Sequence, residues 1–172
     1  MRTKEWLYLA IGTALVTVST MMIQVPTPTQ GYIHVGDGVI LLLVALFGTR
    51  FGAIAAGAGS ALADLLSGYF IWGPFSLVIK AVMALVAGRI MGADGERQVP
   101  VFSARSIAGA LSAAVVMIAG YFIAKWLMVG DAAVAATGIP SNCVQGFGGV
   151  AIYLVVGLVF ERANLHSRLN HH

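Results

Sequence analysis

The stretch "VGDGVILLLVALFGTRFGAIAAGAGSALADLL", residues 35–66, consists of two apolar runs separated only by the short break "GTR". The same character extends along the chain, because 59% of its 172 residues are hydrophobic, only 10% are charged, and the mean hydropathy is +0.89. Soluble domains contain about 25% charged residues, so this composition indicates an integral membrane protein. The apolar runs are continuous and do not alternate as strands of a membrane β-barrel do, which favours helices.

Six apolar segments can be distinguished, and a chain of this length accommodates about six helical spans. We therefore predict an all-α integral membrane protein with six transmembrane helices in a single domain, residues 1–170. His171 and His172 resemble the remnant of a purification tag. The second segment is short, because 13 residues reach roughly 20 Å across a hydrocarbon core of about 30 Å. Flanking residues must extend it, or irregular backbone must continue it inside the protein. The segments are residues 6–23, 35–47, 51–66, 75–91, 106–128 and 142–160.

Basic residues alternate with the predicted spans. With the N-terminus in the cytoplasm, the outer loops hold only Lys125, at the end of the fifth span, and Lys80 lies within a span. The positive-inside rule therefore predicts that both termini are cytoplasmic, as in a multi-pass protein of a prokaryotic cell membrane. The predicted cytoplasmic residues are Arg2, Lys4, Arg50, Arg89, Arg97, Arg105, Arg162 and Arg168.

Several catalytic and cofactor classes have no signature in the sequence. A phosphate-binding loop and a dinucleotide fingerprint are absent, so we expect no ATP hydrolysis by this chain itself. The one cysteine, Cys143, forms neither an intrachain disulfide nor a cysteine cluster for a metal. We expect no catalytic residues, no metal and no cofactor, and the net charge of +3 reflects loop charges rather than a nucleic-acid surface.

Three ionisable residues lie in or beside the apolar segments: Asp37, Asp64 and Lys80. Charges inside a membrane cost several kcal/mol on insertion scales and mark functional sites by default. The predicted orientation places all three in the outer half, where Lys80 can pair with either carboxylate. One interpretation is a buried ion pair that ties spans together, and the other is a polar pocket open to the outside.

Further polar and aromatic residues are predicted at the same level, which favours the pocket. A ligand site has apolar and aromatic walls with a few placed polar groups, and the cytoplasmic half has no comparable cluster. Each residue also has a structural interpretation: an interfacial aromatic belt for Tyr69 and Trp72, a helix N-cap for Asn142, and an interhelical hydrogen bond for Gln145. The residues are Gln24, Gln30, Tyr32, His34, Tyr69, Phe70, Trp72, Asn142 and Gln145.

Small residues recur at four-residue spacing and let helices approach closely. In "YLAIGTALV" the pair is Ala10 and Ala14, on a face that suits either packing within the chain or a partner helix. In "GAIAAGAGSALA", residues 52–63, we expect packing within the chain.

The stretch "GYIHVGDGVILLLVALFGTRFGAIAAGAGSALADLLSGYFIWGPFSLVIKAVMALVAG", residues 31–88, resembles the substrate-binding S component of an energy-coupling-factor (ECF) vitamin transporter. The resemblance covers essentially the whole chain. It is nearest to the branch for hydroxymethylpyrimidine or pyridoxine-type substrates, close to the riboflavin and pantothenate S components. It implies a transport subunit that captures a vitamin outside and docks on a transmembrane coupling subunit (EcfT-type) with two cytoplasmic ATPases (EcfA-type). It also implies that Ala10 and Ala14 contact the coupling subunit, and that the substrate-binding residues are Tyr32, His34, Asp37, Asp64, Trp72, Lys80, Asn142 and Gln145.

The residues themselves favour a small, flat, polar heteroaromatic ligand. Aromatic side chains stack on such a ring, and amide, imidazole and carboxylate groups bond its nitrogens and hydroxyls. A phosphorylated ligand fits less well if Lys80 is the only cation at that depth. An autonomous secondary transporter that uses Asp64 and Lys80 as an ion relay is the alternative.

Overall fold

The computed structural model describes residues 3–26, 32–94 and 99–162, and within them the chain forms seven helices and one short hairpin. The predictions for Gln30, for Arg2, Arg97 and Arg168, and for the tag-like His171 and His172 lie outside these residues. The helices are α1 (Thr3–Met22), α2 (Gly36–Phe47), α3 (Thr49–Leu66), α4 (Gly73–Met91), α5 (Ala104–Val129), α6 (Ala132–Ala136) and α7 (Ile139–Arg162); the strands are β1 (Gln24–Pro26) and β2 (Tyr32–His34).

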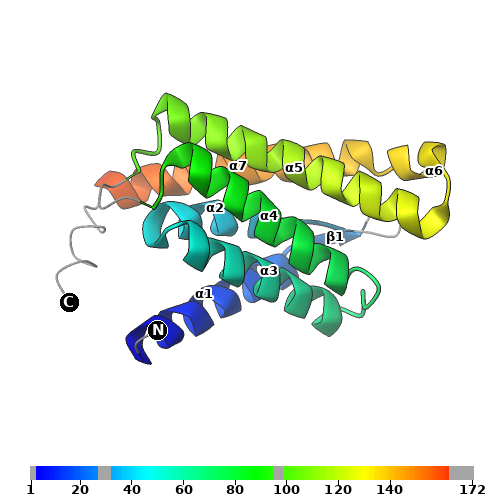
Figure 1. Ribbon diagram of the computed structural model, residues 1–172, viewed down its shortest axis with the longest axis horizontal. Helices are drawn as coiled ribbons and strands as arrows, with labels where there is room; N and C mark the ends of the chain where they lie inside the picture. Colours follow the sequence, from blue (N-terminus) through cyan, green and yellow to red (C-terminus); the bar gives the residue numbers. More distant parts are fainter. Residues whose placement is uncertain (1–2, 27–31, 95–98, 163–172) are drawn as a thin grey trace.

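The long helices lie side by side along the long axis of the molecule, and consecutive ones run in opposite directions (Figure 1). The start of α1 and the end of α7 therefore lie at one end of the bundle, and the short helix α6 lies at the other (Figure 1). Helix α3 packs between α1 and α4, while α7 packs on α2 and α5.

The structure confirms a helix in each of the six predicted segments, with two differences. The expectation of an all-α chain missed the antiparallel pair of β1 and β2, in which Gln24 faces His34 and Pro26 faces Tyr32. Helix α7 begins at Ile139, because Pro140 suits the first turn of a helix, where no backbone donor is needed. Asn142 thus lies inside the helix, and its interpretation as the N-cap is wrong.

Four helical stretches are long and apolar enough to cross a membrane: α1, α4, α5 and the Ala132–Arg162 stretch that contains α6 and α7. Helix α2 is apolar but has only 12 residues. The hairpin and the turn after it continue the backbone of α2 at its N-terminal end. The helix therefore does not begin further back than Gly36, because strand β2 ends at His34.

Small residues on α3 bring it close to its neighbours, as expected from the sequence. A Cβ atom added to Gly59 would lie 2.7 Å from the carbonyl oxygen of Thr13 on α1, and one added to Gly57 would lie 2.7 Å from the carbonyl oxygen of Leu77 on α4. The close approach lets the Thr17 hydroxyl donate a 3.0 Å hydrogen bond to the Gly59 carbonyl. In contrast, Ala10 and Ala14 of α1 are exposed.

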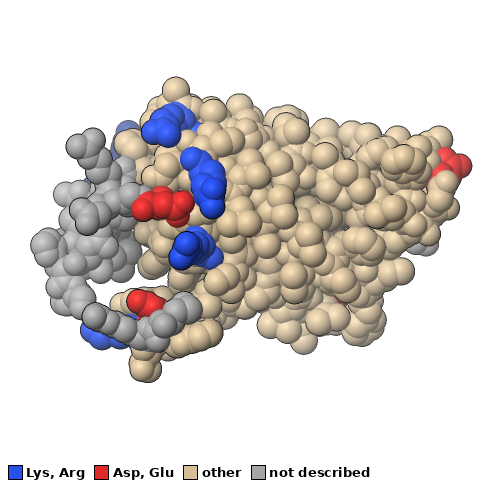
Figure 2. Space-filling view, in the orientation of Figure 1, with Lys and Arg blue, Asp and Glu red and all other residues tan. Residues whose placement is uncertain are grey.

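Charged side chains gather at one end of the bundle (Figure 2). Because the helices alternate in direction, Arg50 at the start of α3, Arg89 at the end of α4, Arg105 at the start of α5 and Arg162 at the end of α7 share that end. Lys125 lies near the opposite end of α5. The bundle therefore has a basic end and an end where the polar residues singled out from the sequence are collected.

Candidate functional site

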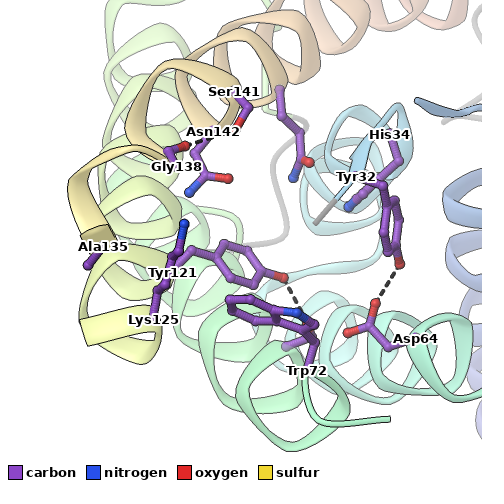
Figure 3. Close-up of a pocket in the computed structure, with 12 residues that line it drawn as sticks. Tyr32, His34, Asp64, Trp72, Tyr121, Lys125, Ala135, Gly138, Ser141 and Asn142 are labelled. Carbon is purple, nitrogen blue, oxygen red and sulfur yellow. Dashed lines mark hydrogen bonds between the residues drawn. The ribbon is translucent and has the colours of Figure 1, made fainter. Parts of the chain in front are cut away.

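A pocket opens at the end of the bundle away from the basic residues. It encloses about 570 Å³ when the open space at its mouth is included. Strand β2, α3, α4, α5, α6 and α7 all contribute to its wall, so the site forms only when these elements pack together (Figure 3). Six of the eight residues that the sequence proposed as substrate-binding line it: Tyr32, His34, Asp64, Trp72, Asn142 and Gln145.

The other two proposed residues, Asp37 and Lys80, are not among the lining residues. They form a salt bridge with each other, and both side chains are almost completely buried, at 1% and 0% exposure. The structure thus decides between the two carboxylates that the sequence left open as partners of Lys80. The Gln145 amide donates a 2.9 Å hydrogen bond to the second Asp37 oxygen. The Asp37–Lys80 ion pair therefore helps to fix the position of Gln145, which lines the pocket.

Asp64 lies in the wall and is held by Tyr32, whose hydroxyl donates a 2.5 Å hydrogen bond to one carboxylate oxygen. Tyr32 also packs against the ring of Tyr69, with centroids 4.7 Å apart, and against His34 at 5.4 Å. Burial, with the neighbouring negative charge of Asp64, raises the pKa of the Tyr32 phenol above its usual value. Tyr32 therefore remains a proton donor.

His34 is buried at the end of β2, and its protonation state follows from its contacts. The Gly36 backbone amide donates a 3.1 Å hydrogen bond to Nδ1, so in the neutral ring the proton is on Nε2. Burial, with a smaller contribution from the positive charge of Lys80, lowers the pKa of His34 to about 4 against the opposing effect of Asp37. At neutral pH, His34 offers the pocket a neutral imidazole.

We expect this neutral state to appear in the pH dependence of stability. Between pH 4 and 6.5 the unfolded chain binds a proton at His34 that the folded chain does not, so stability rises with pH across that window. The difference corresponds to roughly 3 kcal/mol. Thermal unfolding from pH 4 to 8 should show a steeper acid loss for the wild type than for His34→Asn, whose amide oxygen can accept the Gly36 bond. Equal slopes would contradict a neutral buried His34.

The other six lining residues were not predicted as site residues from the sequence: Ser76, Tyr121, Lys125, Ala135, Gly138 and Ser141. Ser76 and Tyr121 share a 2.8 Å hydrogen bond between their hydroxyls, and the Tyr121 ring lies 5.9 Å from the Trp72 ring. Their positions carried a usable signal, since Tyr121 and Lys125 are four residues apart and therefore on one helix face. The expectation that Lys80 is the only cation at this depth is wrong, because Lys125 lines the pocket whereas Lys80 is paired with Asp37 behind it.

Two further residues of the predicted cluster, Gln24 and Phe70, are not among the lining residues. Gln24 donates a 2.9 Å hydrogen bond to the Ser67 hydroxyl and so joins β1 to the end of α3, whereas Phe70 is 67% exposed. The pocket thus has aromatic walls with a carboxylate, an imidazole, amides and an ammonium placed around them. This combination of side chains is typical of a site that binds a small polar aromatic molecule. Among residues 3–26, 32–94 and 99–162, no group of three or more His, Cys, Asp or Glu side chains could hold a metal ion.

Comparisons with known proteins agree with this arrangement. The family model described as "ECF-type riboflavin transporter, S component" matches residues 1–162. An uncharacterised protein of Pyrococcus woesei is 33% identical over 148 residues, 86% of this chain and 95% of that protein. The "Thiamine precursor transporter HmpT" of Lactococcus lactis subsp. cremoris (strain MG1363) is 30% identical over 164 residues, 94% of this chain and 90% of the other. A solved structure titled "Structure and mechanism of the S component of a bacterial ECF transporter" has the same fold, with a TM-score of 0.70 and 22% identity over 96% of this chain and 98% of that one.

Proposed function

The chain belongs to the family of ECF-type riboflavin transporter S components, and we propose that it captures a small heteroaromatic vitamin precursor at the outer face of the cell membrane. It is a transport subunit rather than an enzyme in this family, and delivery inward is powered by partner ATPases. The observation that carries the proposal is the pocket at the non-basic end, where Trp72 and Tyr121 form an aromatic wall among charged and amide groups.

The substrate we propose is a hydroxymethylpyrimidine or a pyridoxine-like ring. The similarity to a thiamine precursor transporter over 94% of the chain supports the first of these. The pocket supports both, because it offers hydrogen-bond donors and acceptors around a flat aromatic space. An S component for riboflavin or pantothenate is the alternative within the family.

We also propose that the helices of all six predicted segments, α1 to α5 and α7, are transmembrane and that both termini are cytoplasmic. The support is the collection of Arg50, Arg89, Arg105 and Arg162 at one end of the bundle, as the positive-inside rule requires of a cytoplasmic end. The pocket then opens to the outside of the cell, where a substrate must be captured.

The proposed partners are a transmembrane coupling subunit (EcfT-type) and two cytoplasmic ATPases (EcfA-type). Helix α1 supports this docking, because it exposes Ala10 and Ala14 together with apolar side chains such as Leu7 and Ile11. A hollow of about 620 Å³ adjoins α1 at the basic end, lined by Tyr8, Phe47 and residues at the start of α3. A partner helix can therefore approach α1 closely over its small residues.

The proposed function is tested by ligand titration of the purified chain. We expect hydroxymethylpyrimidine to change the intrinsic fluorescence, because Trp72 lines the pocket whereas the other two tryptophans, Trp6 and Trp126, are exposed elsewhere. In Trp72→Phe the fluorescence change should be lost while calorimetry still detects binding. Binding of riboflavin or pantothenate, with neither a pyrimidine nor a pyridine ligand bound, would overturn the proposed substrate.

A further inference from the structure

One oxygen of the Asp64 carboxylate is buried in the pocket wall without a hydrogen-bond partner. The residue is 4% exposed, and Oδ1 accepts the bond from Tyr32, whereas Oδ2 has no partner among the described residues. Figure 3 shows this second oxygen on the side of the carboxylate that faces Trp72. A buried acceptor without a donor is costly, so a molecule that brings a hydrogen-bond donor to this oxygen is favoured.

The surrounding protein groups do not supply that donor. The Tyr32 proton is used by Oδ1 of the same carboxylate. The Ser76 hydroxyl lies near Asp64, but it makes no hydrogen bond to Oδ2 in the structure and instead shares one with the Tyr121 hydroxyl. Lys80 is engaged by Asp37. A donor for Oδ2 must therefore come from the molecule in the pocket.

The opposite side of the pocket has the opposite polarity. Lys125 donates one hydrogen bond, at 3.0 Å, to the Thr137 hydroxyl, and an ammonium has three donors. Figure 3 places Lys125 and Asp64 on opposite sides, with Trp72 and Tyr121 between them. A flat ring on this aromatic surface would have its donor edge toward Asp64 and an acceptor substituent toward Lys125.

We propose that Asp64 is the specificity-determining residue of the pocket and selects aminopyrimidine ligands, whose exocyclic N–H donates to Oδ2. This inference rests on the proposed function, and it favours the pyrimidine over the pyridoxine-like ring. The exocyclic amine group itself presents only donors, because its lone pair is delocalised into the ring. A keto oxygen there would place its lone pairs against the carboxylate, and a hydroxyl of a pyridine alcohol would donate but leave its own oxygen in need of a donor.

The test compares two ligands of nearly the same shape: 4-amino-5-hydroxymethyl-2-methylpyrimidine and the analogue in which a 4-oxo group replaces the amine. We expect the wild type to bind the amino compound about 10- to 150-fold more tightly, the effect of a hydrogen bond to a charged group. In Asp64→Asn this ratio should fall toward one, because the amide can donate to the oxo group. Asp94→Asn, which changes an exposed carboxylate at the basic end, is the matched control and should keep the wild-type ratio.

The outcomes separate this inference from the proposed function. Equal binding of the two pyrimidines by the wild type, or an unchanged ratio in Asp64→Asn, overturns the role of Asp64 and leaves the transport function standing. Tighter binding of pyridoxine than of the aminopyrimidine also overturns it. If Asp64→Asn fails to fold in size-exclusion chromatography, the wild-type ratio and Asp64→Ser provide the same comparison. Failure to bind any of these rings overturns the proposed substrate itself.

Discussion

Replacing Lys80 with methionine is expected to destabilise the protein by about 3–5 kcal/mol, the cost of removing one partner of a buried salt bridge. Asp37 would keep the hydrogen bond from Gln145 but lose the ammonium, whose Nζ also lies 5.3 Å from the centre of the Tyr121 ring. The pair joins α2 to α4, and through Gln145 it also reaches α7. We expect the Lys80→Met variant to have a lower free energy of unfolding than the wild type when both are measured by denaturant titration in detergent.

Two further variants separate the charge from the loss of side-chain volume. Lys125→Met makes the same change at a partly exposed lysine and should cost less than about 1 kcal/mol, as for other solvent-exposed charge contacts. The double variant Asp37→Asn/Lys80→Met removes the uncompensated charge and should recover most of the stability. If Lys80→Met is as stable as the wild type, the salt bridge is not what holds α2 and α4 together.

Replacing Ala10 or Ala14 with tryptophan is expected to abolish uptake and leave ligand binding by the isolated chain unchanged. Both residues are exposed on α1, and a bulky ring there would hold a partner helix away from the close approach that small residues permit. The pocket is built from β2 and α3 to α7, without α1, so its affinity should not change. Uptake is measured with labelled substrate in cells that also produce the coupling subunit and both ATPases.

Ala119→Trp is the matched control, because Ala119 is exposed on α5, and α5 lies on the opposite side of the bundle from α1 (Figure 1). This variant should transport normally and co-purify with the partner subunits, whereas the α1 variants should not. Full uptake by both α1 variants would refute docking through α1. Gradient-driven uptake by the purified chain alone in liposomes would instead favour an autonomous transporter.

The positions of the helices, and the end of the bundle at which the polar residues collect, could be predicted from the sequence. Apolar runs must be long enough to cross the hydrocarbon core, and Pro and Gly mark the breaks between them, so the six segments are visible without a structure. The basic residues then indicate which ends of the helices lie together. This was sufficient to place Tyr32, His34, Asp64, Trp72, Asn142 and Gln145 at one end.

The rotation of each helix about its axis could not be predicted. In a soluble protein the polar face of a helix shows which side is exposed, but lipid and protein core are both apolar, so that contrast is missing here. Ser76, Tyr121 and Lys125 were overlooked for this reason: the four-residue spacing of Tyr121 and Lys125 puts both on one face of a helix, but the sequence does not show that this face meets the pocket. The hairpin before α2 was also missed, because strands of three residues carry too short a pattern.

The sequence by itself thus determined the class of protein, the number of long helices and the end of the bundle where polar groups collect, because these depend on composition and on distance along the chain. Only the tertiary structure decided that Lys80 pairs with Asp37 and that Asp64 keeps one carboxylate oxygen for the pocket. Both carboxylates lie at a depth that Lys80 can reach, and the choice between them depends on how α2, α3 and α4 pack, which is set by contacts between residues distant in sequence.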